Sequence, residues 1–517
     1  MIVRIQCHQY LLGVDIGTYS SKGVLVDAHT GEITGSHVIE HNISIPKPGW
    51  AEHDADHVWW HEFVQISQQL LSTTKINPEE IKAIGTSGLG ACVLPVDAAG
   101  KPLRQAILYG IDTRAVAEMA ELERVFGKEK IFQISLMNLS TQSTGPKILW
   151  IKNHEPQIYS QTRYFLTSEA YLVQKLTGNA TLDYLTAADF APMFDVQKNT
   201  WNADTTQYIT PIEKLPDLSW SCELGGYVSR QAAQETGLLE GTPVIVGTTD
   251  GGSEALSAGV SNIGDMMMMF GSSFYFILKT GKITPTELIW SSAWLEESAY
   301  TLQGGTSTSG SLTRWFRDNL APLEAAAQNK GGENAYASLA KLLDQSPLGA
   351  NGLIALPYFE GERTPVHDPQ ARGVLFGLAL TNTRADIYRA LLEGIGFGIR
   401  HILDEMRKAD VFPNRMVGVG GGTQNLGWMQ MISDIANIEM VIPEKQIGAC
   451  YGDAFMAGVG VGLYKNLNEI TRWVHNKYQI KPNPEIHKKY EPLYKIYRGL
   501  YEQTKGLMHD LSILYRG

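Results

Sequence analysis

Two stretches in different halves of the chain share one design: an apolar strand, a short turn of glycine and hydroxyl residues, and a second apolar strand. They run from Tyr10 to Asp27 and from Gly264 to Gly281. β-rich runs around such a turn predict a β-hairpin with its polar atoms at the tip. A chain of 517 residues is too long for one hydrophobic core, so we expect two domains of related fold. We place them at residues 1–252 and 253–517.

The rest of the chain alternates strands with helices, which is typical of α/β proteins. An apolar run ending at the carboxylate of Asp250 predicts a strand over Thr242–Gly252, and glycines at 420–422 predict a strand-to-helix turn. The spacing of apolar residues predicts helices over 58–71, with Asp54 or Asp56 as the N-cap, through much of 113–177, over 384–408 and over 490–514.

Charge, cysteine content and the length of apolar runs exclude several classes of function. The formal charge of −11 argues against a nucleic-acid partner, because phosphate backbones repel an acidic chain. There are four cysteines and no CxxC pair, which fits a reducing cytoplasm. No apolar run reaches the ~18 residues of a membrane span, and the start of the chain lacks the cleavage site of a signal peptide. We therefore expect neither a membrane partner nor secretion.

The first hairpin tip, Asp15-Ile16-Gly17-Thr18, has the chemistry of a phosphate loop. Gly17 lets backbone amides approach phosphate oxygens, and the hydroxyls of Thr18, Ser20 and Ser21 can donate further bonds. Asp15 would repel phosphate but suits the water ligands of a Mg²⁺ ion. The alternative is an ordinary hairpin with a polar tip.

Gly271-Ser272-Ser273 is the matching tip in the second half, and Gly420 to Gly422 precede a helix. Two tips of this kind can bind a polyphosphate, and a helix N-terminus favours anions. A plain turn and tight strand-to-helix packing are the alternatives. The thirteen histidines show no metal-ligand spacing.

Two carboxylates are candidates for chemistry on hydroxyl groups. Asp250, among small residues at a strand end, suits a general base that accepts a hydroxyl proton; the alternative is a turn-forming aspartate. Asp112 and Arg114 can both bond polyol hydroxyls, and a surface ion pair or helix cap is the alternative.

Taken in order, these motifs resemble the FGGY family of carbohydrate kinases, over essentially the whole chain. Ser143 to Pro156 looks like the family's first signature, with Lys147 and Trp150 in place. Gly373 to Gly394 looks like the second and departs from it at Leu391. The resemblance implies the two-domain α/β fold of actin, hexokinase and Hsp70, with ribonuclease H-like domains and an interdomain cleft. It implies ATP as co-substrate, Mg²⁺ as cofactor, a small sugar as acceptor, and a homodimer.

The resemblance also assigns roles position by position. It makes Asp250 the catalytic base, Asp15 a Mg²⁺ site acting through water, and Asp112 a sugar ligand. Gly421, Gly422 and Asn425 would border the adenosine. Phosphate binding would fall to Gly17, Thr18, Ser20, Lys22, Gly271, Ser272 and Gly310.

Within the family, the chain is most similar to xylulokinases, judged by its length and by Leu356 to Pro365. The typical loop SGQMHG reads SGLGAC here, so Gly90 and Ala91 replace a Met-His pair whose histidine contacts the sugar in the family. A site that loses a polar partner favours a substrate lacking the matching hydroxyl, unless a neighbouring side chain or a water fills the gap. We therefore expect a ketopentose, either D-xylulose or a deoxy analogue. The alternatives are a gluconate, glycerol or ribulose kinase, and a non-catalytic sugar sensor related to actin and Hsp70.

Overall fold

The computed structural model describes residues 8–516, so Cys7 and the other first residues of the segment considered for a signal peptide lie outside the described part. The chain forms two compact units. The first contains the residues up to Ile263 together with Lys279–Thr301 and Ile447–His475. The second contains Gly264–Leu278, Leu302–Gln446 and the residues from Asn476 onward. The units therefore do not follow a single cut at residue 252, because two later segments pack into the first unit.

The first unit is built on a sheet with the strand order β13-β14-β5-β1-β2-β3, in which β15 also pairs with β5. The predicted hairpin is present as β1 and β2, which pair antiparallel. β5 runs parallel to β1, and this register places Ser87 beside Asp15. The strands are β1 (Tyr10–Ile16), β2 (Ser20–Asp27), β3 (Ile33–Glu40), β5 (Ile81–Gly88), β13 (Leu224–Tyr227), β14 (Pro243–Ile245) and β15 (Thr248–Thr249).

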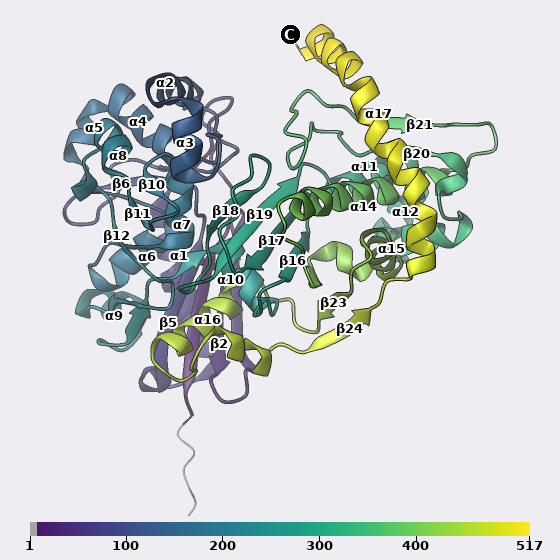
Figure 1. Cartoon of the computed structure of the whole chain (residues 1–517). Coiled ribbons are helices and arrows are strands. Elements are labelled where there is room, and N and C mark those ends of the chain that lie inside the picture. The colour runs from purple at the N-terminus through teal and green to yellow at the C-terminus, as the bar shows by residue number, and fades with distance from the viewer. Residues whose placement is uncertain (1–7, 517) are drawn as a thin grey trace, which may run out of the picture. The chain divides into compact units, whose positions relative to one another are not determined.

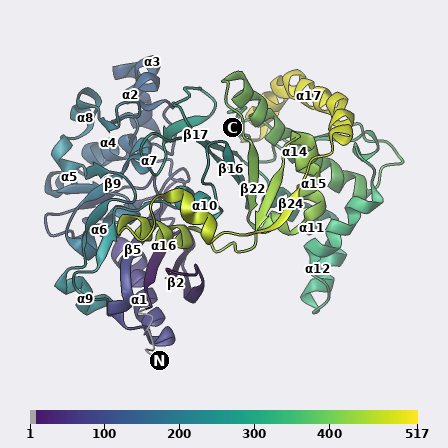
Figure 2. The ribbon, with the colours of Figure 1, turned by 60° about the horizontal axis from the view of Figure 1, so that its bottom comes forward.

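Helix α16 (Ala449–Gly460) lies on this sheet although it comes late in the chain, as Figure 1 shows beside β5 and β2. Two glycines permit the close approach. A Cβ on Gly13 would lie 1.9 Å from the carbonyl oxygen of Cys450, and one on Gly85 would lie 2.2 Å from that of Asp453. Helix α10 (Asp250–Ser257) packs alongside α16 (Figure 2).

The other helices of the first unit enclose the rest of its core. The predicted helix from Val58 begins earlier, as a π-helix over Ala55–Trp60 that continues into α1, and Asp54 is its N-cap, accepting a bond from the His57 amide. The α-helices are α1 (His61–Thr74), α2 (Val116–Phe126), α3 (Lys128–Ser135), α4 (Thr144–His154), α5 (Pro156–Gln161), α6 (Ser168–Thr177), α7 (Tyr184–Ala187), α8 (Ala203–Ile209) and α9 (Arg230–Thr236).

The second unit contains the second predicted hairpin, β16 and β17, within strands ordered β19-β17-β16-β22-β23-β24. Met266 to Met268 are buried in β16, as expected of an apolar strand. The strands are β16 (Asp265–Phe270), β17 (Phe274–Thr280), β19 (Tyr300–Thr306), β22 (Arg415–Val419), β23 (Met440–Pro443) and β24 (Asn476–Ile480).

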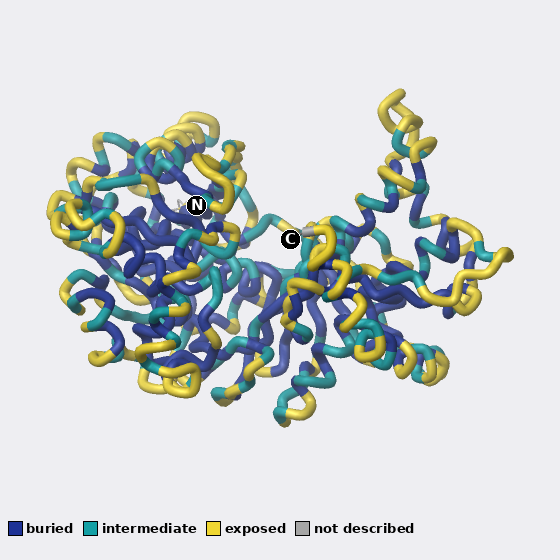
Figure 3. Tube along the Cα trace, turned by 90° about the horizontal axis from the view of Figure 1, so that it is seen from above, coloured by how far each residue is buried: buried dark blue, intermediate teal, exposed yellow. Residues whose placement is uncertain are grey.

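Helices α14 (Arg384–Lys408) and α15 (Leu426–Ala436) pack on each other in this unit. The predicted bounds of α14 are confirmed, whereas the last helix, α17 (Pro484–Arg516), begins earlier than predicted. The remaining α-helices are α11 (Gly310–Leu320), α12 (Pro322–Asn329) and α13 (Ala335–Ala340). Within residues 8–516, no helix is both long and apolar enough to cross a membrane. In both units the central strands are buried and exposed residues gather on the connecting loops (Figure 3).

Candidate functional site

The first hairpin tip holds Asp15 at the end of β1, where it is 8% exposed. The Gly17 amide donates to the carbonyl of Ser20 at 3.0 Å and closes the tip. Thr18 Oγ1 lies 2.7 Å from the hydroxyl oxygen of Tyr109. Lys22 stands opposite Asp15 in the β1–β2 register and lowers the pKa of that carboxyl, although burial still raises it to about 6. The tip therefore combines backbone amides and hydroxyl groups with one buried acid.

Asp250 is the first residue of α10 rather than the last part of a strand. The strand predicted over Thr242–Gly252 is interrupted at Gly247, which has φ +79° and lies against the Thr86 carbonyl, where a Cβ would come within 2.2 Å. The Asp250 carboxylate accepts a bond from the amide of Gly251 at 2.7 Å. Burial and the charge of Asp15 raise the pKa of Asp250 to about 8. A carboxyl group with this pKa is suited to exchange protons near neutral pH.

Asp15, Asp250, Glu254 and Asp453 form an acidic cluster in the first unit. Burial and Asp15 raise the pKa of Glu254 to about 7, and burial raises that of Asp453 well above its usual range. The charge of Lys22 opposes the shifts of Asp15 and Glu254. Within residues 8–516, no three His, Cys, Asp or Glu side chains are arranged to hold a metal ion by themselves. The excess negative charge nevertheless fits a divalent cation held through water and phosphate ligands, which is how Mg²⁺ is usually bound.

Asp453 was not predicted from the sequence. Its hydrogen-bond contacts bear on whether its carboxyl group carries a proton. Its two oxygens lie 2.7 Å from Ser87 Oγ and 2.6 Å from Ser253 Oγ. Ser87 Oγ also lies 3.2 Å from Asp15, and Ser253 Oγ lies 2.8 Å from the carbonyl of Ala449. The two hydroxyls supply one proton each for these four contacts. A proton on Asp453 satisfies a third, which agrees with the pKa that burial raises and favours the neutral carboxyl group. A lone acid in the otherwise apolar sequence of α16 was the available signal.

The residues predicted to contact sugar lie in the same unit. Gly90 and Ala91 follow β5, and the carbonyl of Ala91 accepts a bond from the buried Lys147 ammonium at 2.9 Å. Burial lowers the pKa of Lys147 to about 8. Asp112 and Arg114 form a buried ion pair with an Oδ2–Nη2 distance of 2.7 Å, so the alternative of a surface pair is wrong. Asp112 also accepts from the Ala51 amide at 2.7 Å, and its role as a sugar ligand stays a prediction.

The second unit contains a cavity of about 530 Å³. All six residues predicted there for ATP binding line it: Gly271, Ser272, Gly310, Gly421, Gly422 and Asn425. The sequence analysis missed the other lining residues, which no short motif marks: Phe270, Thr313, Arg314, Asn334, Tyr336, Ala337, Ala340, Tyr388, Gln424 and Trp428. The structure therefore brings together motifs that are far apart in sequence.

Backbone contacts shape one wall of this cavity. The Gly310 amide donates to the carbonyl of Gly271 at 2.9 Å, and the amides of Ser309 and Ser311 both donate to that of Ser272. A Cβ on Gly310 would lie 2.5 Å from the Gly271 oxygen, so only glycine fits at the start of α11 without movement. At another wall, Asn425 caps α15 by accepting from the Trp428 amide. Close backbone turns beside Tyr336, Tyr388 and Trp428 suit a ligand with a flat ring and polar oxygens.

Comparison with known proteins identifies the relatives of this chain. The N-terminal domain model of the FGGY family of carbohydrate kinases matches residues 10–257, and the C-terminal domain model matches residues 266–461. The xylulose kinase of Bacillus subtilis is 28% identical over 504 residues, covering 96% of this chain and 98% of that protein. The gluconokinase of the same organism is 25% identical over 514 residues and covers 98% of both chains.

Solved structures agree with these matches. The crystal structure of xylulose kinase from Rhodospirillum rubrum superposes with a TM-score of 0.89 at 28% identity, and covers 97% of this chain and 100% of that one. The predicted two-domain α/β fold and the predicted ATP-dependent phosphorylation of a sugar are therefore confirmed. This chain belongs to the FGGY family of carbohydrate kinases.

Proposed function

We propose that this sugar kinase phosphorylates a neutral ketopentose of the D-xylulose type and that Asp250 is its catalytic base. The observation that carries the proposal is the Asp250 carboxyl at the start of α10, with its pKa raised to about 8 in the acidic cluster. The full-length similarity to xylulose kinases supports the choice of sugar. A region rich in carboxylates also disfavours an anionic acceptor such as gluconate, because like charges repel.

The reaction transfers one phosphoryl group and one proton. A hydroxyl oxygen of the sugar forms a bond to the γ-phosphorus as the bond from that phosphorus to the ADP oxygen breaks. The hydroxyl proton passes to the Asp250 carboxylate. Its raised pKa strengthens it as a base and lowers the fraction that is ionised at neutral pH.

Binding of ATP is assigned to the residues that line the cavity of the second unit. We propose that Gly421, Gly422 and Asn425 border the adenosine and that Gly271, Ser272 and Gly310 bind phosphate oxygens. Gly17, Thr18, Ser20 and Lys22 supply further phosphate contacts. Asp15 would hold Mg²⁺ through water, and that ion would neutralise charge on the phosphates when bound. A homodimer and a cytoplasmic location stay predictions.

An ADP-release assay with D-xylulose, D-ribulose, the monodeoxy xyluloses, gluconate and glycerol tests the proposal. We expect D-xylulose to have the highest kcat/KM and activity to require Mg²⁺. Activity restricted to gluconate or glycerol would reject the ketopentose. ATP turnover that is independent of every sugar would reject a sugar acceptor in this group.

A further inference from the structure

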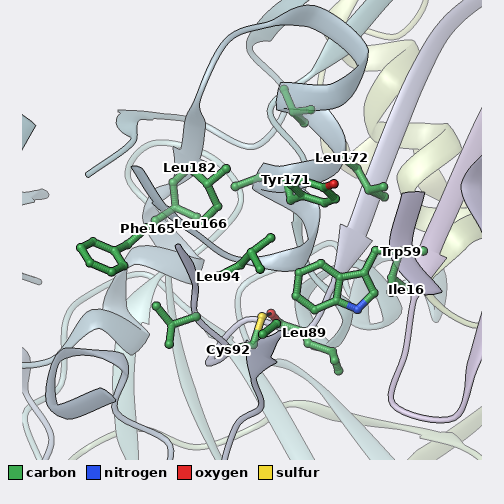
Figure 4. Packing of buried hydrophobic residues seen from close by; sticks show 14 of the residues in the cluster. Ile16, Trp59, Leu89, Cys92, Leu94, Phe165, Leu166, Tyr171, Leu172 and Leu182 are labelled. Atoms are coloured by element: carbon green, nitrogen blue, oxygen red, sulfur yellow. Dashed lines mark hydrogen bonds between the residues drawn. The ribbon is translucent and has the colours of Figure 1, made fainter. Parts of the chain in front are cut away.

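The loop between β5 and β6 (Leu94–Val96) leaves a space that another part of the chain fills. Leu89 and Cys92 are buried in the core of the first unit and anchor the loop on both sides (Figure 4). Gly90 lies between them without a side chain. A Cβ built on Gly90 would lie 2.7 Å from Asp189 Oδ2 and 2.9 Å from Thr249 Cγ2. The carboxylate of Asp189 therefore occupies the position that a larger residue at 90 would take.

Asp189 is held there by its neighbours in the chain. It belongs to a 3₁₀ turn over Ala188–Phe190, and both of those flanking residues are fully buried. Asp189 itself is only partly buried. Among residues 8–516, no donor lies within hydrogen-bond distance of its side-chain oxygens. A positioned carboxylate with open lone pairs is a hydrogen-bond acceptor that awaits a donor.

The surroundings of Asp189 connect it to the reaction. Thr249, which touches the same space, directly precedes Asp250, and the charge of Asp189 contributes to the raised pKa of Asp250. Burial raises the pKa of Asp189 itself to about 7, and Lys147 opposes that shift. At slightly alkaline pH the carboxylate is largely ionised. Its open oxygens then suit the hydroxyl of a neutral polyol and repel an anionic one.

We propose that Asp189 is a specificity-determining residue that accepts a hydrogen bond from one hydroxyl of the sugar, in place of a side chain from the loop. This inference rests on the proposed function and identifies a residue that recognises one hydroxyl group of the sugar. It also reverses the expectation of a deoxy substrate. Ala91 stands where the family has the sugar-contacting histidine, and Asp189 Oδ2 lies beside its neighbour Gly90. The carboxylate therefore supplies a polar partner next to the altered position, which favours the fully hydroxylated ketose.

The test compares D-xylulose with each monodeoxy xylulose in the wild type, Asp189→Ala and Asp189→Asn. In the wild type we expect one deoxy analogue to lose about 10- to 100-fold in kcat/KM, as befits a bond to a charged acceptor. In Asp189→Ala that ratio should fall close to one, through a higher KM for D-xylulose with an unchanged KM for ATP. Asp189→Asn, which keeps an acceptor oxygen, should retain part of the discrimination. The exposed acid Asp204, changed to Asn, is the matched control.

Unchanged kcat/KM and unchanged discrimination in both Asp189 variants would overturn the inference. Asp189→Asn preserves the size and shape of the side chain. It therefore tests the role of Asp189 in substrate discrimination even if the alanine variant fails to fold. Sugar-induced shifts in Tm without ATP give a second readout of the same contact. If the wild type uses a sugar other than a ketopentose, the proposed function fails, and the deoxy analogues of that sugar test Asp189 separately.

Discussion

The two units hold candidate sites of opposite chemical character. The acidic cluster of the first unit contains Asp15, Asp250, Glu254 and Asp453, and burial raises the pKa of each acid. Lys22 opposes the shifts of Asp15 and Glu254. The cavity of the second unit is lined by glycines, hydroxyl groups and aromatic rings, with Arg314 as the charged member of its lining. Charge state governs the first site, whereas backbone shape governs the second. Substitutions should therefore reduce activity through a change of charge in the first site and through a change of backbone shape in the second.

The largest effect is expected from removing the charge of Asp250. Asp250→Asn keeps the size of the side chain and removes the proton acceptor, so kcat should fall by about 10²- to 10⁴-fold. Binding of ATP, measured by calorimetry, should stay near the wild-type value because Asp250 is assigned no contact with ATP. Asp204→Asn on the exposed surface is the control. Turnover close to wild type would remove Asp250 from the role of base.

The next effect tests shape in the second unit. Gly310→Ala places a methyl group 2.5 Å from the Gly271 carbonyl oxygen. Such overpacking costs about 1–3 kcal/mol, so we expect KM for ATP to rise by about 5- to 150-fold. Gly506→Ala in α17 has no atom within 4 Å of the new Cβ and serves as the matched control. An unchanged KM for ATP in Gly310→Ala would show that this wall of the cavity can move without weakening ATP binding. That result would contradict the view that backbone shape governs the second site.

The acids of the first unit should make activity and stability depend on pH in opposite directions. Asp15 and Asp250 have pKa values of about 6 and 8, above their usual range, so kcat/KM should rise with pH between 6 and 8 as the free enzyme loses these protons. Stability should change in the opposite direction. A raised folded-state pKa gives stability that is present at low pH and is lost as pH rises through that pKa.

Thermal unfolding between pH 5 and 9 checks this sign, and Asp250→Asn should flatten the decline. Gly310→Ala should leave the slope unchanged, since no acid is altered. Stability that rises with pH through this range would contradict the raised pKa values.

The sequence revealed the second site better than the first. All six glycine, serine and asparagine positions predicted there line one cavity, because a glycine-rich turn carries its geometry locally. Tyr336 and Tyr388 reach the same cavity from separate helices, and no local pattern places them. The two hairpins and α14 were predicted with their bounds for a similar reason: strand alternation and helical spacing are local signals.

The first site depended on contacts that no local pattern encodes. Asp453 reaches Ser87 only because Gly13 and Gly85 let α16 settle on the sheet. Asp189 fills the space at Gly90 from a turn far along the chain. The sequence indicated that Asp112 and Arg114 could form a pair, but it did not indicate that the pair is buried. Charge relations between distant segments thus had to come from the structure.

The smallest effect concerns the neutral acid. Burial raises the pKa of Asp453 well above its usual range, which favours the protonated carboxyl. Asp453→Asn then substitutes one neutral donor-acceptor group for another. We expect it to lower the free energy of unfolding by no more than about 1 kcal/mol, the net worth of a typical hydrogen bond. Asp453→Leu leaves the hydroxyls of Ser87 and Ser253 buried with fewer partners and should cost about 2–6 kcal/mol, at about 1–3 per unsatisfied group. Urea unfolding at pH 7 measures both. If Asp453 were ionised, both of its oxygens would accept hydrogen bonds, and Asn would place a donor where one of them accepts. A loss well above about 1 kcal/mol in Asp453→Asn would therefore contradict a protonated Asp453.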